Sequence, residues 1–191
     1  MIQRVVVGIS GASGAAIGLR ILERLANLDD VETHLVVSGA AEKTLRHEVG
    51  SHALARAWEL ADVRHDNGAV GASIASGSFR TLGMIVAPCS MRTLSAIAAS
   101  LSDNLMVRAA DVHLKERRRL VLLTRESPLH IGHLRSMLQA TEMGAIVAPP
   151  VPAFYQLPES VADIVDAIAA RAIDLLGVPG GPHAPIWSGL Q

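Results

Sequence analysis

The first eighteen residues decide the fold, and they read Met1-Ile-Gln-Arg-Val-Val-Val-Gly-Ile-Ser-Gly-Ala-Ser-Gly-Ala-Ala-Ile-Gly18. The β-branched run at 5–7 is typical of a strand that is buried on both faces of a parallel sheet. Three glycines then predict a turn, and residues 15–26 have the pattern of an amphipathic helix. This arrangement brings free backbone N–H groups and the positive end of a helix dipole together, so we expect the turn to bind a phosphate. Ser10 and Ser13 would add hydroxyl groups there.

The kind of phosphate follows from the residues around this turn. The spacing is G-x-x-G-x-x-G, which differs from the G-x-G-x-x-G of dinucleotide sites. The next predicted strand, 32–37, ends in Ser38, where an NAD site would carry an acidic residue for the ribose. No Gly-Lys-Ser/Thr follows, as a nucleoside triphosphate loop would require. We therefore predict a mononucleotide such as FMN, and the alternative is a turn whose small residues serve only packing.

Composition sets the class of protein. A chain of 191 residues is long enough for one domain with a full core. A net charge of −1 gives no general attraction to nucleic acid or to an anionic membrane. The single cysteine, Cys89, excludes a disulfide framework and a cysteine-built zinc site, and without a recognisable acid–base partner we interpret it as a buried thiol. Because no leader peptide and no apolar run of membrane-spanning length is found, we expect a soluble, cytoplasmic protein.

Strands and helices alternate along the rest of the chain. Strands are predicted at 5–7, 32–37, 84–87, 120–123 and 145–148, and helices at 15–26, 39–48, 93–101, 105–117, 134–143 and 161–176. Residues 62–80 are rich in turn formers and are predicted to be mainly loop. This order predicts an α/β fold: a single-domain, Rossmann-like, doubly wound and mostly parallel sheet with helices on both faces. We expect the domain to cover 1–178 and residues 179–191 to form a loose tail.

The unusual residues follow the carboxyl ends of the predicted strands. They are the turn at 8–14, Ser38, and the segments 88–90, 125–126 and 149–155. In an open doubly wound sheet these ends line one crevice, where ligands bind. The sequence therefore predicts one binding site at this edge.

Cationic residues suggest a second phosphate site in the same crevice. Arg108 and Lys115 are seven apart on one predicted helix and share a face, and Arg125 follows a strand. Arg171 interrupts the apolar stripe of the last helix, where it either snorkels or meets an anion. Glu48 and Glu126 are candidate acid/base groups, and Tyr155 can offer a phenol to a phosphate oxygen.

Six motifs together resemble one known family. They are Gly-Ala-Ser-Gly at 11–14, Ile-Ala-Ser-Gly-Ser at 74–78, Pro-Cys-Ser at 88–90, Asp-Asn-Leu-x-x-Arg-Ala-Ala-Asp-Val-x-Leu-Lys-Glu-Arg at 103–117, Arg-Glu-Ser-Pro-Leu-His at 125–130 and Pro-Pro-Val-Pro-Ala-Phe-Tyr at 149–155. From residue 5 to about 177 the chain resembles the UbiX/Pad1 flavin prenyltransferases. The long motifs at 103–117 and 125–130 make the resemblance specific.

The resemblance implies an activity and its partners. Members of that family join a dimethylallyl group, supplied as dimethylallyl phosphate, to N5 and C6 of reduced FMN without a metal. The product, prenylated FMN, serves UbiD-type decarboxylases in aromatic acid decarboxylation or ubiquinone biosynthesis. The family assembles as dodecamers with active sites at subunit contacts, and we expect the small-residue helices at 93–117 to form part of such contacts.

The resemblance also assigns residues to roles. The flavin would be held by Gly11, Ala12, Ser13, Ser38, Ser90 and Arg108. The prenyl phosphate would be held by Lys115, Arg125, Tyr155 and Arg171. Glu48, Glu126 and Ser13 would be catalytic, and no residue is assigned to a metal.

Two other functions stay open at this stage. One is an FMN-dependent decarboxylase of the related cysteine-decarboxylase type, and the other is a non-catalytic subunit that carries flavin to a decarboxylase. Lys115, Arg125 and Arg171 argue against the decarboxylase, because an oxidative decarboxylation needs no second phosphate site.

Overall fold

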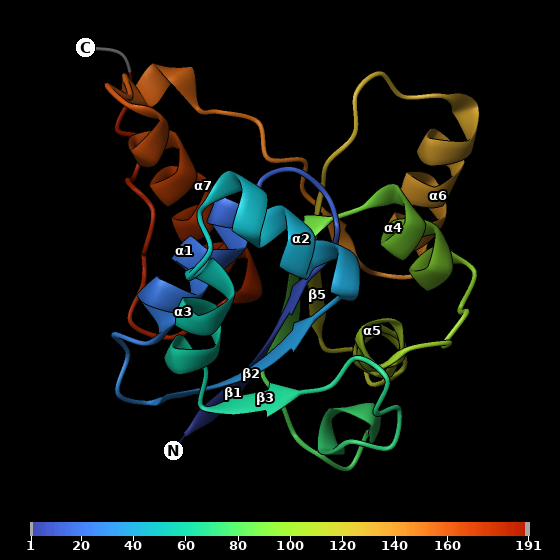
Figure 1. Ribbon diagram of the computed structural model, residues 1–191. Helices are drawn as coiled ribbons and strands as arrows, with labels where there is room; N and C mark the ends of the chain where they lie inside the picture. Colours follow the sequence, from blue (N-terminus) through green and yellow to red (C-terminus); the bar gives the residue numbers. More distant parts are fainter. Residues whose placement is uncertain (1, 190–191) are drawn as a thin grey trace.

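A six-stranded sheet forms the centre of the computed structural model, which describes residues 2–189 (Figure 1). Its strands lie in the order β3-β2-β1-β4-β5-β6, and every neighbouring pair is parallel. They are β1 (Gln3–Ile9), β2 (Val31–Val37), β3 (Val63–His65), β4 (Gly83–Cys89), β5 (Arg119–Thr124) and β6 (Ile146–Val147). The predicted fold class is confirmed. The first residue of the predicted domain and the last two of the predicted tail lie outside the described residues.

Helices cover both faces of this sheet (Figure 1). One face carries α1 (Ala15–Leu25), α2 (Gly39–Glu48), α3 (Ala53–Leu60) and α7 (Val161–Leu176). The other carries α4 (Met91–Ala98), α5 (Leu105–Lys115) and α6 (Ile131–Glu142). Two short 3-10 turns, η1 (Ser73–Ala75) and η2 (Phe154–Gln156), lie in the connections. The sheet therefore separates two apolar cores.

Strand β1 is central because its apolar run serves both cores. Val5, Val6 and Val7 are all fully buried. Side chains alternate along a strand, so Val5 and Val7 pack in the core with α1 and α7, while Val6 packs in the core with α5. A strand with apolar residues on both faces needs helices on both faces, as the sequence predicted.

The capping signals at the helix ends are confirmed. Ser38 begins α2, and its hydroxyl accepts a hydrogen bond from the Ala41 N–H. Ser160 and Asp163 form a complete capping box at the start of α7, and Gly177 ends that helix in the left-handed conformation at φ 78°.

Three elements were missed, namely β3, η1 and α3. Residues 62–80 are not only loop, because β3 pairs with β2 at the edge of the sheet and η1 follows it. Strand β3 has the sequence Val-Arg-His, which lacks the apolar alternation that marks a strand. It lies at the edge of the sheet, where a strand is less buried and needs no such alternation. Helix α3 was also missed, and it packs Ala53, Leu54 and Ala57 into the core.

The C-terminal residues are held in place, which corrects the expected loose tail. The Asp174 carboxylate of α7 accepts hydrogen bonds from the N–H groups of His183 and Ala184, at 2.8 and 3.0 Å. The sequence does not predict this arrangement, because the contacts are made by backbone N–H groups, and the proline- and glycine-rich segment carries no apolar pattern.

Candidate functional site

The glycine turn lies where the sheet changes direction. Strands β1 and β4 are neighbours, but α1 after β1 covers one face and α4 after β4 covers the other. Such a point leaves a crevice at the carboxyl ends of the two strands. The turn at 10–14 and Ser90 meet there, as predicted.

Ser10 ties the two loops together and is not a ligand-binding group. It is 1% exposed, its hydroxyl donates to the Pro88 carbonyl at 2.9 Å, and it accepts a hydrogen bond from the Ser90 N–H at 2.8 Å. Both hydrogen-bonding functions are used inside the protein. The expectation that Ser10 adds a free hydroxyl is therefore wrong.

The rest of the turn is open to a ligand. Gly14 is the N-cap of α1 at φ 103°, a conformation that favours glycine. A Cβ at Gly11 would overlap Ala40 of α2, so glycine lets the turn pack against that helix. Ser13 is exposed, and within residues 2–189 its hydroxyl makes no hydrogen bond. The Ala12 N–H donates to the Ser10 carbonyl at 2.9 Å, which tightens the turn.

Glu48 already compensates the positive end of α1. One carboxylate oxygen, Oε2, accepts hydrogen bonds from the N–H groups of Gly14 and Ala15, both at 2.9 Å. An anion at this position is stabilised by the helix dipole. The predicted acid/base residue thus lies at the predicted phosphate turn, and two of the N–H groups expected to be free are occupied.

Three helices begin around this turn. Ser38 caps α2 and Ser90 caps α4, where its hydroxyl accepts from the Thr93 N–H at 3.3 Å and donates to the Thr93 hydroxyl at 3.1 Å. Strands β2 and β4, which lead into these helices, flank β1 on its two sides. The N-termini of α1, α2 and α4 therefore meet at one edge, which favours an anionic ligand.

Lys115 lies away from the turn within one chain, whereas Arg108 is on the first turn of α5, where Met106 packs against Gly8. Arg108 pairs with Asp111 at 2.9 Å and donates to the Ala75 carbonyl at 3.3 Å. Lys115 is the last residue of α5, pairs with Glu116 at 2.5 Å and lies next to Gly77. A helix between parallel strands runs opposite to them, so the end of α5 lies at the amino edge of the sheet. The expected gathering of these cations in the crevice is not found in a single chain.

Arg125 and Glu126 follow β5 at the carboxyl edge, as predicted. Both are exposed, and the Glu126 carboxylate accepts a hydrogen bond from the Ser127 N–H at 3.0 Å. Among residues 2–189 the Arg125 guanidinium has no ion-pair partner. It is therefore available to an external anion.

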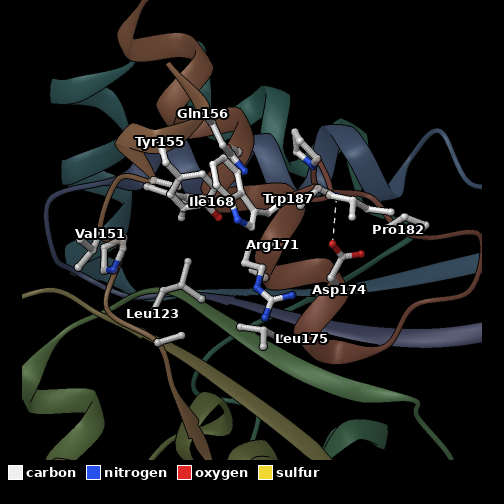
Figure 2. A pocket seen from close by; sticks show the side chains of 18 of the residues that line it. Leu123, Val151, Tyr155, Gln156, Ile168, Arg171, Asp174, Leu175, Pro182 and Trp187 are labelled. Atoms are coloured by element: carbon white, nitrogen blue, oxygen red, sulfur yellow. Dashed lines mark hydrogen bonds between the residues drawn. The ribbon is translucent and has the colours of Figure 1, made fainter. Parts of the chain in front are cut away.

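Tyr155 and Arg171 share a pocket of about 430 Å³ between α7 and the segment that follows β6 (Figure 2). In the described part of the chain Arg171 makes no ion pair, and neither it nor the Tyr155 hydroxyl makes a side-chain hydrogen bond. Trp187 also lines the pocket, and sequence reasoning missed it. The sequence signal that could have found it is the rarity of tryptophan, since the chain has two.

Other candidate chemistry finds no support. Burial raises the pKa of the Cys89 thiol to about 12, so it stays protonated, as expected of a buried thiol. In residues 2–189 no three His, Cys, Asp or Glu side chains are grouped to hold a metal ion. None of the helices in that range combines the length and the apolar character needed to cross a membrane.

Comparison with known proteins agrees with the geometry. A family model described as Flavoprotein matches residues 1–173, which makes this Rossmann-type protein a flavoprotein. "Flavin prenyltransferase UbiX" of Salmonella typhimurium is 54% identical over 177 residues, which cover 93% of each chain. The chain belongs to the UbiX flavin prenyltransferase family.

Two crystal structures are similar over nearly the whole chain. The structure of AnUbiX (PadA1) in complex with FMN and dimethylallyl pyrophosphate has a TM-score of 0.94 and 46% identity, and covers 100% of both chains. A dodecameric FMN-dependent Ubix-like decarboxylase from Escherichia coli O157:H7 has a TM-score of 0.93 and 46% identity, with 98% of this chain and 100% of the other covered. The predicted family is confirmed.

Proposed function

We propose that this protein transfers a dimethylallyl group from dimethylallyl phosphate to N5 and C6 of reduced FMN. The observation that carries the proposal is that a chain of this family offers two separate places suited to an anion. One is the turn where three helices begin, and the other is the pocket with the Tyr155 phenol and Arg171, which makes no ion pair within residues 2–189. A reaction that joins a flavin phosphate ester to a prenyl phosphate ester needs both.

The turn has the groups that a flavin phosphate requires. The hydroxyl of Ser13 and the N–H groups of Gly11 and Ser13 would donate to phosphate oxygens, with Ser38 and Ser90 beside them. Reduced FMN, when bound, supplies the nucleophilic edge of its ring system. Glu48 stands at the same helix end, so the phosphate shares the α1 N-terminus with this carboxylate or displaces it.

The cations would stabilise the departing phosphate. Arg125 and Arg171 can each form two parallel charge-assisted hydrogen bonds with phosphate oxygens, and Lys115 and Tyr155 add further donors. These bonds strengthen as negative charge collects on the leaving group, which lowers the barrier. The exposed carboxylate of Glu126 would accept the proton released from the flavin carbon.

One chain cannot bring all these residues together. Lys115 lies at the amino edge of the sheet, while Ser13 and Arg125 lie at the carboxyl edge. We therefore propose that neighbouring subunits complete each active site. The dodecameric relative supports such an assembly.

We also propose a surface for subunit contacts that differs from the one expected at 93–117. Residues 93–117 supply few large apolar side chains to the surface, because those of α4 and α5 are buried in their own chain. Helix α6 and the residue pair before it instead expose Leu129, Ile131, Leu134 and Leu138, at 42 to 63%. We propose that this face, called the α6 face below, is covered by another subunit.

A direct assay separates the three functions. The protein is incubated without oxygen with reduced FMN and dimethylallyl phosphate, or with the pyrophosphate, and the flavin is analysed by mass spectrometry. A flavin heavier by one five-carbon unit is expected. Unchanged FMN with both donors would contradict the proposal. In a separate reaction with oxidised FMN as the electron acceptor, release of carbon dioxide from a cysteine-terminated peptide would support the decarboxylase. Flavin binding with neither reaction would support a carrier.

The product has a proposed receiver. We propose that prenylated FMN passes to a UbiD-type decarboxylase in the cytoplasm. The reaction mixture, freed of this protein, should activate such a decarboxylase prepared without cofactor, whereas FMN alone should not.

A further inference from the structure

The C-terminal strap, residues 178–189, is a built part of the Arg171 pocket. The Asp174 carboxylate fixes it through the N–H groups of His183 and Ala184, and Arg24 of α1 donates to the His183 carbonyl at 3.5 Å. Figure 2 shows the hydrogen bond by which the strap is held near Arg171, with the Ala184 N–H as donor and the Asp174 carboxylate as acceptor. The strap is thus anchored on α7, the helix that carries Arg171.

The strap supplies an apolar wall to this pocket. Trp187 packs edge-on against Tyr155, with ring centroids 5.0 Å apart and planes at 73°. Figure 2 places Trp187 next to Ile168 and above Arg171. The apolar side chains on the other walls are Leu123, Val151, Ile168 and Leu175.

The pocket therefore has two chemical halves. The Arg171 guanidinium, which has no ion-pair partner among residues 2–189, and the Tyr155 phenol make one half suited to an anion. Aliphatic side chains and the Trp187 indole make the other half suited to a hydrocarbon. A phosphate ester of a short prenyl chain has both features, whereas free phosphate would leave the apolar half unmatched.

We propose that the strap forms the hydrocarbon end of the prenyl-donor site and that Trp187 sets the chain length accepted. This inference rests on the proposed function for the identity of the donor. Its physical basis is the sensitivity of an apolar pocket to chain length, since one methylene changes discrimination by about 10- to 200-fold. Removing the indole should open the wall and admit a longer chain.

Binding is tested first, without any need for turnover. Trp58, the other tryptophan, lies on α3 and does not line the pocket. In a Trp58→Phe protein, Trp187 is the single fluorophore of its kind, and dimethylallyl phosphate should change its emission in a saturable way. Inorganic phosphate should change it less at equal occupancy. No change with the prenyl ester would overturn the proposal, even if the protein makes no product.

Specificity is tested next with donors of five and ten carbons. Trp187→Ala should lower kcat/KM for dimethylallyl phosphate and raise the geranyl-to-dimethylallyl ratio at least about tenfold, with FMN affinity unchanged. Trp58→Ala is the matched control and should keep the wild-type ratio. A Trp187→Ala ratio equal to that of the control would overturn the proposal. Failure of the wild type with both donors would instead count against the proposed function.

Asp174 is assigned as a positioning residue. Asp174→Ala should loosen the strap and raise KM for dimethylallyl phosphate about tenfold while kcat changes less than about twofold, because the anion half is untouched. Asp174→Asn keeps one acceptor oxygen and should restore part of the loss. Inhibition by inorganic phosphate should stay as in the wild type. A fall in kcat with KM unchanged, or no change in either, would contradict this role.

Discussion

At the scale of single residues, substitutions at the N-terminus of α1 test the proposed flavin site most sharply. Glu48 accepts hydrogen bonds from two N–H groups there, and the Ser13 hydroxyl beside it makes no hydrogen bond within residues 2–189. A flavin phosphate would meet one negative charge on entry and would depend on the remaining donors. Small changes of charge at this point should therefore have large effects.

Ser13→Asp should weaken FMN binding by at least about a hundredfold, because a hydrogen bond to phosphate worth about 1.5–3 kcal/mol is replaced by repulsion. Fluorescence titration of FMN measures this. The exposed Ser51 offers a control, since Ser51→Asp adds the same charge at a residue that is not part of the turn. Equal FMN affinity in the two variants would show that the turn does not hold the phosphate.

Arg125 distinguishes the two anion sites. Arg125→Ala should leave FMN binding nearly intact and remove prenyl transfer, because a bidentate arginine contributes most as the leaving phosphate gains charge. Arg125→Lys should recover only part of the rate, since a point charge cannot form the paired bonds. Loss of FMN together with normal donor binding would assign Arg125 to the flavin instead.

His113 should make stability depend on pH. Its ring donates from Nδ1 to the Ala109 carbonyl at 2.7 Å and accepts from the Thr81 hydroxyl at 2.8 Å, so the neutral form fits the fold. Burial lowers the pKa of His113 to about 4, below the usual value of about 6.5. The folded-state pKa is the lower one, so stability is full above pH 6.5 and falls as the pH drops toward 4.

The loss from His113 should reach about 3 kcal/mol at pH 4, at about 1.36 kcal/mol per unit. Urea unfolding followed by circular dichroism measures the free energy of unfolding at each pH. The loss is the difference in its pH dependence between the wild type and His113→Gln, which lacks the titrating ring. His47→Gln, an exposed change on α2, should keep the wild-type slope. Parallel pH curves for wild type and His113→Gln would refute the assignment.

At the scale of elements, what the sequence predicts depends on whether an element carries its own signals. Strand β1 carries a β-branched run, and α7 carries a capping box and a terminal glycine, so both were predicted closely. Strand β3 has three residues and only its partner β2 to define it. Lys115, at the end of α5, was predicted to lie in the crevice for another reason. Residues that follow a strand lie at the carboxyl edge of the sheet, whereas the end of a helix that runs opposite to the strands lies at the amino edge.

The candidate site was predictable to the same degree. Ser13, Ser38 and Ser90 follow strands, and the parallel sheet gathers them. The strap was not predictable, because Asp174 fixes it through backbone N–H groups that any sequence carries. Glu48 reached the turn through the packing of α2 on α1, which no local pattern shows.

The capping box of α7 is an element-scale contribution to stability. Ser160→Ala should lower the free energy of unfolding by about 1 kcal/mol, because the Asp163 N–H loses its acceptor. Chemical unfolding measures the change. Ser51→Ala, at an exposed position whose side chain makes no hydrogen bond within residues 2–189, should change stability by less than about 0.5 kcal/mol. An effect equal to that of the control would show that the cap contributes nothing.

At the scale of the whole molecule, the α6 face should hold the assembly together. Leu134→Arg places a charge in the proposed contact and should give smaller particles with reduced prenyl transfer, measured by light scattering and by the flavin assay. Ala55→Arg, on the exposed side of α3, is the control and should keep the assembly. An unchanged particle size for Leu134→Arg would place the contact elsewhere.

Subunit mixing tests most directly whether the two anion sites become one active site by assembly. Ser13→Asp and Lys115→Ala subunits, each inactive alone, are unfolded together, reassembled at equal amounts and assayed for prenylated FMN. If each site takes Ser13 from one subunit and Lys115 from another, random assembly leaves about a quarter of the sites intact, so about a quarter of wild-type activity should return. Mixed assemblies that form but stay inactive would contradict a shared site.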